Sequence, residues 1–185
     1  ESVIIKPSNL LNSLAPAILQ LRPKAKALVL RAPLPVFLKS VAKKGITGRL
    51  WVRDLLIKQI RDNFIDFGFE NEDYLGLTDL QAGAIGWLAQ LTLFENMIDQ
   101  FTNTRIRCLD SESLLNESRL SIAALTSFFN IELDESALVG ILSSSVFTNN
   151  SKTGEPYSRV ERKLSYDNAA QAHSDEISKV IIWTE

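Results

Sequence analysis

Cysteine and histidine are nearly absent from this chain of 185 residues, which contains one of each, Cys108 and His173. A single cysteine excludes an internal disulfide and a zinc site built from several cysteines. A single histidine excludes a metal site built from several histidines. We therefore expect no bound metal ion, and we expect Cys108 to act as a small apolar side chain in a buried strand.

Long apolar runs are also absent. No stretch of about 18 uninterrupted apolar residues occurs, so we expect no membrane-spanning helix. No secretion signal is visible, and we expect a cytoplasmic protein. With 45% hydrophobic and 23% charged residues, the composition is typical of one globular domain over residues 1–185. The chain begins with Glu1 and its single methionine is Met97, so we expect a processed product or part of a longer protein.

Basic residues are concentrated at the front of the chain. Residues 1–61 contain 12 Lys and Arg against 2 acids, whereas residues 62–146 contain 3 against 14. The front third therefore favours an anionic partner such as a phosphate, a sulfate or a nucleic acid. Alternatively, its charges are solvated or pair with the acidic middle of the chain. Few aromatic residues interleave with the basic ones, so nucleic acid is the less favoured partner.

Three short apolar runs predict strands. They span residues 3–6, 27–31 and 105–110, and helical patterns separate them. Continuous apolar strands alternating with helices are typical of a parallel sheet covered on both faces. The sequence therefore predicts an α/β fold of three layers, with a short, mostly parallel sheet flanked by many helices.

Apolar periodicity and capping residues predict the helices that connect these strands. In the longest helix, Gly83 and Gly86 indicate close packing, and in a later one Leu120 is expected to face inward. Polar segments over residues 68–76 and 143–163 are expected to be loops. The predicted helices span residues 10–21, 33–44, 49–67, 78–100, 111–115, 118–129, 135–142 and 165–183.

Several common catalytic motifs are missing. The sequence has no GxxxxGK[ST] or GxGxxG phosphate loop and no GxSxG nucleophile turn. His173 is expected on a helix beside Ser174 and Asp175, and consecutive helical side chains point about 100° apart. These neighbours therefore cannot form a catalytic triad with one another, and we expect His173 to be a partly exposed helix residue.

The stretch that follows the second predicted strand carries the best candidate site. Arg31 ends that strand, and ligands of parallel α/β sheets bind at the carboxyl ends of strands. The N-terminus of the next helix adds a partial positive charge, and Ser40 can present a hydroxyl. The planar guanidinium of Arg31 suits a phosphate, because it forms bidentate hydrogen bonds. Alternatively, Arg31 pairs with an acid at a neighbouring strand end, such as Asp110.

These residues resemble an element of the sulfotransferases of the P-loop superfamily, which use 3′-phosphoadenosine 5′-phosphosulfate (PAPS). There, a strand ends in Arg-x-Pro and a helix with a serine follows, as in Arg31-Ala32-Pro33 and Ser40. The spacing from arginine to serine is nine residues here and eight in the family. Residues 107–115, followed by a helix that ends at 127–131, are similar to a second element of that family, in which a strand, an acidic turn and a helix follow one another. The polar segment with Ser151, Lys152, Arg159, Arg162 and Lys163 resembles the family's lid.

The resemblance implies a nucleotide cofactor, PAPS or its product adenosine 3′,5′-bisphosphate (PAP). Arg31 and Ser40 would bind the 3′-phosphate, and Lys152 and Arg159 would close the lid. A sulfuryl group would be transferred to an acceptor of unknown identity. In the family, the phosphosulfate-binding loop and its lysine precede the first strand predicted here, and the catalytic base usually lies between that loop and this region. We therefore expect this chain to be the C-terminal part of such an enzyme, inactive alone and with an open sheet edge.

The alternative function is a non-catalytic α/β module that binds a protein. Its binding surface would be the acidic stretch 62–146 or the basic front third. In the sulfotransferase hypothesis, four further cations could steer the anionic nucleotide, although the first two are equally consistent with solvated surface charges: Lys43, Lys44, Arg49 and Arg53.

Overall fold

The computed structural model describes residues 3–64, 66–149 and 154–185, with the backbone alone for Leu10 and Arg159. The described chain is helix-rich and has a small parallel sheet, which confirms the α/β class. Its elements are η1 Asn9–Leu14, α1 Ala15–Leu21, β1 Ala27–Arg31, α2 Leu34–Lys43, α3 Gly45–Arg61, α4 Asn71–Gly76, α5 Asp79–Gln100, β2 Ile106–Asp110, α6 Ser111–Asn116, α7 Ser118–Phe129, α8 Glu135–Leu142, η2 Ser145–Phe147, α9 Arg159–Ala172 and α10 Ser174–Trp183.

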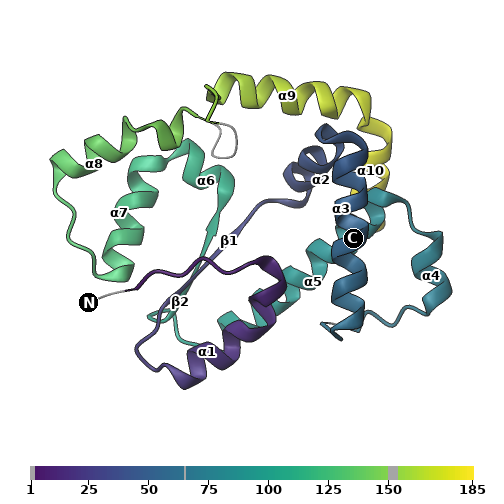
Figure 1. The fold of residues 1–185 in the computed structure, drawn as a ribbon, viewed down its shortest axis with the longest axis horizontal. Helices are drawn as coiled ribbons and strands as arrows, with labels where there is room; N and C mark the ends of the chain where they lie inside the picture. Colours follow the sequence, from purple (N-terminus) through teal and green to yellow (C-terminus); the bar gives the residue numbers. More distant parts are fainter. Residues whose placement is uncertain (1–2, 65, 150–153) are drawn as a thin grey trace.

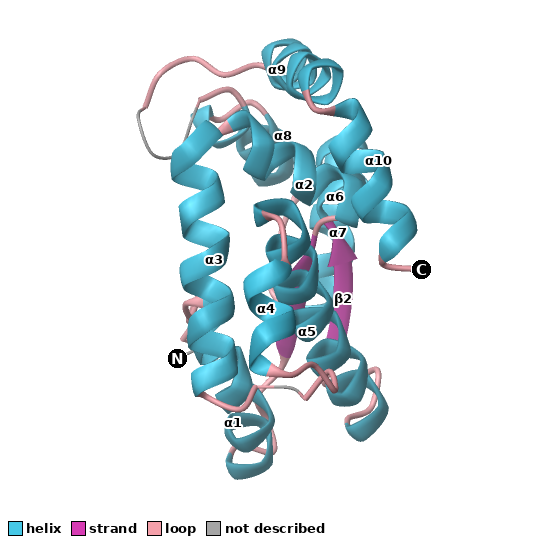
Figure 2. Ribbon diagram, turned by 90° about the vertical axis from the view of Figure 1, so that its right-hand side faces the viewer, coloured by secondary structure: helices cyan, strands magenta, loops and turns pink. Residues whose placement is uncertain are grey.

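The sheet consists of β1 and β2, which run parallel at the centre of the molecule (Figures 1 and 2). The register pairs Val29 with Cys108 and Arg31 with Asp110. Helices α1 and α5 cover one face, where Val29 and Ile106 pack with Leu19 and Met97 in an apolar cluster. Successive strand residues point to opposite faces. Leu30 points to the other face and is 53% exposed.

The strand predicted over residues 3–6 is wrong. This segment has no strand structure, and Val3, Ile4 and Ile5 are between 77% and 82% exposed. A buried strand needs a neighbour for its backbone hydrogen bonds and an apolar layer over its side chains. Within the described residues, this segment has neither.

A second core joins helices from both halves of the sequence. Leu38 and Val41 of α2 pack with Val52 of α3, Leu80 of α5 and Val180 of α10. The close packing expected at the α5 glycines is confirmed. A methyl group on Gly83 would lie 3.4 Å from Val52 of α3, and one on Gly86 would lie 2.9 Å from the Oε1 atom of Gln59.

The predictions for residues 45–76 are wrong in two respects. The third helix begins at Gly45 and ends at Arg61, rather than spanning 49–67. The segment predicted as a loop over 68–76 contains α4, which is held by a reciprocal capping box. The Asp73 amide donates to the Glu70 carbonyl oxygen at 3.1 Å, and the Asp73 carboxylate accepts from the Glu70 amide at 2.9 Å.

The long C-terminal helix predicted over 165–183 is two helices. The first, α9, begins at Arg159, within the segment predicted as a loop, and packs along α2. The second, α10, buries Ile177 and Val180 in the core with α2 and α5. The turn at His173 lets the two helices follow these different directions, as Figure 1 shows at the end of α9. His173 is partly exposed, as expected.

Two burial predictions on the remaining elements are wrong. Cys108 is exposed, because the apolar cover of β2 is centred on Ile106 near the start of the strand. Leu120 of α7 is 66% exposed. Helix α7 packs on the short α6 through small polar residues, and the hydroxyl of Ser121 donates to the carbonyl oxygen of Ser113 at 3.3 Å. None of the helices in the described ranges is long and apolar enough to cross a membrane.

Candidate functional site

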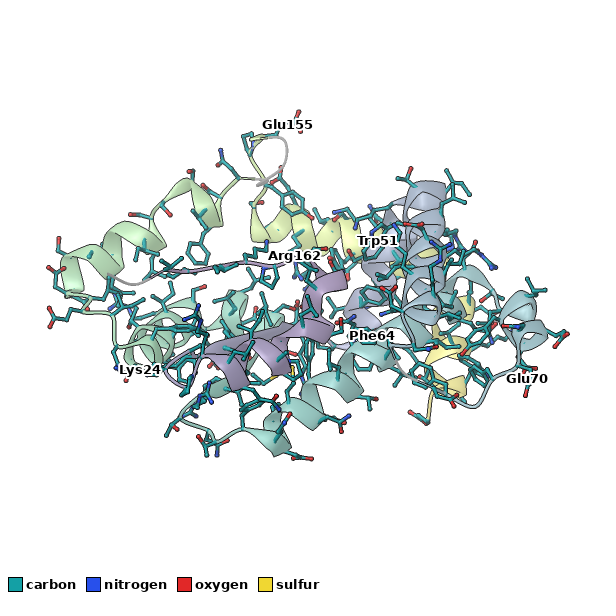
Figure 3. All side chains as sticks on the ribbon, turned by 60° about the horizontal axis from the view of Figure 1, so that its bottom comes forward. Lys24, Trp51, Phe64, Glu70, Glu155 and Arg162 are labelled. Carbon is teal, nitrogen blue, oxygen red and sulfur yellow. The ribbon has the colours of Figure 1, made fainter. Side chains whose placement is uncertain are left out.

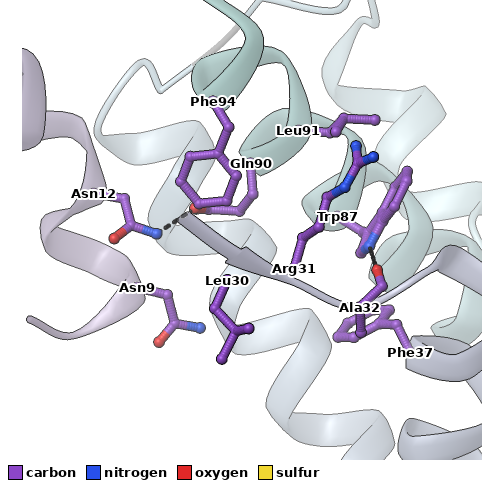
Figure 4. Close-up of a pocket in the computed structure, with 10 residues that line it drawn as sticks. All are labelled: Asn9, Asn12, Leu30, Arg31, Ala32, Phe37, Trp87, Gln90, Leu91 and Phe94. Carbon is purple, nitrogen blue, oxygen red and sulfur yellow. Dashed lines mark hydrogen bonds between the residues drawn. The ribbon is translucent and has the colours of Figure 1, made fainter. Parts of the chain in front are cut away.

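A pocket of about 240 Å³ opens at the carboxyl end of β1 (Figure 4). Three elements far apart in sequence form its walls: η1, the end of β1 with the start of α2, and the middle of α5. Arg31, the predicted site residue, extends into this space beside Trp87 and Leu91. The lining residues are Asn9, Asn12, Leu30, Arg31, Ala32, Phe37, Trp87, Gln90, Leu91 and Phe94.

The guanidinium of Arg31 has neither a hydrogen bond nor an ion-pair partner among the residues that the structure describes. Asp110, the acid at the neighbouring strand end, is its register partner along the backbone. The Asp110 carboxylate is otherwise engaged, because it caps α6 and accepts from the amide of Glu112 at 2.7 Å. The geometry therefore leaves the charge of Arg31 available to a ligand in the pocket.

The chain that follows Arg31 is fixed by a tryptophan. The indole Nε1 of Trp87 donates to the carbonyl oxygen of Ala32 at 2.9 Å. Pro33 then precedes α2, whose first turn includes Pro35, so the backbone at this corner has few freely rotating bonds. A partly buried tryptophan that donates its N–H to the main chain is both an apolar wall and a positional anchor. The side chain of Arg31 therefore starts from a well-defined backbone.

A buried amide faces the same pocket from α5. The Oε1 atom of Gln90 accepts from the Nδ2 atom of Asn12 at 2.7 Å. The Nε2 atom of Gln90 is buried, and it has no hydrogen-bond partner in the described part of the chain. An unpaired buried donor costs about 1–3 kcal/mol. The wall of the pocket therefore includes an unpaired donor, which a ligand oxygen or ring nitrogen would satisfy if the Gln90 side chain turned toward the pocket.

The sequence analysis missed Trp87, Gln90 and Asn12. They are separated from Arg31 by many residues, and only the folded chain brings η1 and α5 to the end of β1. A weak signal was present for Gln90. It interrupts a run of small and aliphatic residues in the middle of α5, where a polar side chain needs a partner.

Ser40, the second predicted phosphate ligand, lies about two turns into α2 and is half-buried. It does not line the pocket that contains Arg31. The structure therefore does not bring the two predicted phosphate ligands together there. A difference of one residue in spacing turns a helical side chain by about 100°, which is the physical reason that this spacing matters.

The predicted lid residues can be located only in part. Lys152 lies outside the described residues, and Arg159 is the first residue of α9, whose side chain is not described. The rest of this region is anchored. Arg162 forms a bidentate ion pair with Glu112, at 2.6 Å between Nη2 and Oε1. Figure 3 shows Arg162 toward the middle of the molecule and Glu155 at its periphery.

Lys43 makes a second anchor for this region. Its ammonium donates to the hydroxyl of Tyr157 at 2.7 Å and lies 4.9 Å from the centre of that ring. Burial raises the pKa of Tyr157, but hydrogen bonds with Lys43 and Ser165 outweigh burial, and the pKa lies below its ordinary value. Lys43 therefore holds the segment before α9 against α2 rather than pointing freely into solvent.

Two of the other cations considered for anion steering are paired. Arg49 donates to Glu176 at 2.8 Å and also lies near Asp79, while Arg53 pairs with Asp79. The Glu176 hydrogen bond raises the pKa of Arg49 further above neutrality. For Arg53 the alternative interpretation of the basic front third is confirmed, since Asp79 belongs to the acidic middle of the chain, whereas the hydrogen-bond partner of Arg49 lies near the C-terminus.

No group of three or more His, Cys, Asp and Glu side chains capable of holding a metal ion occurs within the described ranges. We compared the chain with protein-family models, with curated proteins and with solved structures, and none of the three comparisons found a match. The function is therefore inferred from the residues themselves.

Proposed function

We propose that this chain binds the 3′-phosphate of an adenine nucleotide at the pocket beside β1, as the nucleotide-binding part of a sulfotransferase-like protein. The observation that carries this proposal is the guanidinium of Arg31 at the end of a parallel strand, which no described side chain pairs with. The Arg31-Ala32-Pro33 resemblance to sulfotransferases supports the same assignment. In this proposal the cofactor is PAPS, and PAP is the product that remains bound.

The chemistry of the pocket fits a nucleotide phosphate with its attached sugar or base. Arg31 can form two parallel hydrogen bonds to phosphate oxygens. Phe37, Trp87 and Phe94 supply flat apolar walls, and aromatic side chains stack on nucleobases with about 1–3 kcal/mol per base. The volume of about 240 Å³ is below the ~300–1,000 Å³ of most ligand pockets. Part of the nucleotide would therefore lie outside the pocket.

Gln90 adds specificity to this assignment. Its Nε2, which is buried, would turn to an acceptor atom of the ligand, while its Oε1 keeps the hydrogen bond from Asn12. A ligand without an acceptor at that point leaves the donor unpaired. A site built to hydrogen-bond a ligand rejects analogues that lack the group, for this reason.

The transfer of a sulfuryl group to an acceptor is the wider part of the proposal. Preorganised positive charge must then stabilise the moving group. Arg31 would hold the 3′-phosphate, which does not react, and Lys152 and Arg159 would close over the nucleotide. Arg162 and Lys43 would position the segment that carries them, through Glu112 and Tyr157.

Calorimetric titration of the chain with PAP tests the nucleotide site. Arg31→Ala should weaken binding by about 2 kcal/mol or more, as expected for a lost charge-assisted bond. Arg61→Ala is the matched control, because Arg61 is an exposed arginine at the end of α3, outside the pocket. Adenosine 5′-monophosphate, which lacks the 3′-phosphate, should bind wild type and Arg31→Ala equally. Equal PAP affinity for wild type and Arg31→Ala would remove Arg31 from the site.

A non-catalytic interaction module is the second candidate function. The observation that favours it is the exposure of large apolar residues, including Leu30 of the sheet, Ile4 near the start of the chain and Leu120 of α7. Exposed apolar area of this kind is typical of surfaces that bind another protein. The same calorimetric experiment separates the candidates, because the interaction module predicts no nucleotide binding.

A further inference from the structure

A second cavity, unrelated to the nucleotide pocket, lies at the start of α5. This groove of about 430 Å³ has walls from the segment around α4, the first turns of α5 and the end of α10. Figure 1 shows α4 at the right-hand edge of the molecule, on the far side of α3 from the sheet. The nucleotide pocket is lined by residues further along α5. The groove is lined by Phe69, Glu72, Asp73, Gly76, Leu77, Gln81 and Trp183.

Two aromatic rings give this groove an apolar surface that remains accessible. Phe69 is 38% exposed and Trp183 is 42% exposed. Phe69 is held edge-to-face against Tyr74, with 5.6 Å between ring centres. Leu77 closes the floor and is buried in the core beneath α5. The rings come from opposite parts of the sequence, so the groove exists only in the folded chain.

Two carboxylates, Glu72 and Asp73, line the groove, and no cation among the residues that the structure describes is paired with either. Residues 62–104 contain eight acids and no Lys, Arg or His. Glu72 lines the groove, is exposed, and makes no hydrogen bond or ion pair with the residues described. Arg53, on the adjacent α3, is already paired with Asp79 and donates to the carbonyl oxygen of Leu77 at 2.6 Å. Glu70, labelled in Figure 3, adds a further carboxylate at the periphery.

We propose that this groove docks a peptide segment of another protein in which lysine or arginine alternates with apolar side chains. The apolar side chains would contact Phe69, Leu77 and Trp183. A cation would pair with Glu72 and lie over an aromatic face, where a cation–π contact contributes about 0.5–2 kcal/mol. Charge complementarity excludes acidic and phosphorylated segments, since like charges across an interface cost several kcal/mol.

Fluorescence anisotropy with labelled six-residue peptides tests the docking groove. A peptide of alternating leucine and lysine should bind the chain. A leucine–glutamate peptide and a serine–lysine peptide should bind at least tenfold more weakly, because each lacks one of the two complementary features. Equal binding of the lysine peptides with leucine and with serine would overturn the proposal, since charge alone would then explain it. Absence of binding by the leucine–lysine peptide would overturn it as well.

Matched variants locate the binding on the chain. Glu72→Lys should weaken the leucine–lysine peptide at least tenfold, whereas Glu132→Lys, at an exposed acid between α7 and α8, should not. Trp183→Ala should weaken binding of the leucine–lysine peptide, whereas Ile182→Ala, at the exposed neighbour outside the groove, should not.

A second measurement separates the docking groove from the nucleotide site. The affinity for PAP should stay unchanged in Glu72→Lys. If Glu72→Lys instead abolishes a dimer and leaves peptide binding intact, the occupant is a second copy and the proposal is wrong.

Discussion

Arg31 and Asp110 end the two strands side by side, yet the Asp110 carboxylate turns to the amides of Glu112 and Ser113. The acid therefore serves as the N-cap of α6, and among the described residues Arg31 has no counter-ion. A neighbouring acid that is committed to a helix cap leaves an arginine available for an anionic ligand.

Asp110→Ala tests this division of roles. Removing an N-cap carboxylate should lower the free energy of unfolding by about 1 kcal/mol. PAP affinity should change by less than about threefold, since Asp110 does not compete for Arg31. Urea denaturation measures the first effect and calorimetry the second. A large gain in PAP affinity would show that Asp110 does neutralise Arg31 in solution.

Gln90→Leu should have different effects on the stability of the chain without ligand and on the binding of PAP. The variant loses the hydrogen bond from Asn12, worth about 0.5–1.5 kcal/mol, and also removes an unpaired buried donor that costs about 1–3 kcal/mol. We expect an unchanged or higher melting temperature without ligand and a smaller rise on adding PAP. Thermal unfolding with and without PAP measures both. The prediction fails if the PAP-induced rise is the same as in wild type.

Gly86→Ala should destabilise the contact between α3 and α5. The added methyl group would lie 2.9 Å from Oε1 of Gln59, whose Nε2 donates to the Gly86 carbonyl oxygen at 3.2 Å. Overpacking of this kind costs about 1–3 kcal/mol. Gly140→Ala in α8 is the control, because nothing lies within 4 Å of its added methyl group. The control should gain up to about 1 kcal/mol, and a similar loss in both variants would contradict the close approach.

Tyr157 and Tyr74 should ionise in that order as the pH rises. Burial raises the pKa of Tyr157, but its hydrogen bonds with Lys43 and Ser165 lower the pKa by more than burial raises it. The net result is a pKa below the ordinary value for tyrosine. Burial raises the pKa of Tyr74, and the charges of Asp66 and Asp73 add to this. Ionisation of Tyr157 therefore stabilises the folded chain above its folded pKa, and this contribution disappears as the pH falls through that value.

Ultraviolet absorption of the phenolate between pH 7 and 12 checks the order. Tyr157→Phe should remove absorbance from the lower part of the titration, and Tyr74→Phe from the upper part. The same Tyr157→Phe variant, compared with wild type in urea, should lose relative stability as the pH approaches 10. Identical titrations of the two variants would show that the Lys43 contact does not persist in solution.

Local patterns in the sequence were sufficient for much of the secondary structure. Both strands at the centre, β1 and β2, were predicted within one residue, because short apolar runs between helices have few other solutions. The starts of α5 and α8, predicted at residues 78 and 135, also agree with the structure within one residue, and Thr78 and Asp134 are their N-caps. Their side chains satisfy backbone amides two or three residues away, which is a local interaction.

The wrong predictions of burial and of the last helix share one cause, which is a contact between elements distant in sequence. Residues 3–6 have the composition of a buried strand and lie exposed, and Cys108 has apolar neighbours and is exposed. Burial depends on which distant element covers a residue, and α1 and α5 cover only part of the sheet. The division of the last helix at His173 has the same origin, because α9 and α10 follow different neighbours.

For the candidate site, the sequence by itself determined one residue, Arg31, because the end of a parallel strand is a position that a strand pattern identifies. Tertiary structure decided the rest. It brought Trp87 and Gln90 of α5 to that strand end, left Ser40 outside the pocket and placed Trp183 against the acidic groove of α4. The walls of a pocket are side chains from elements that are distant in sequence. Whether these side chains come together depends on how the helices pack, and this packing is determined by the whole core.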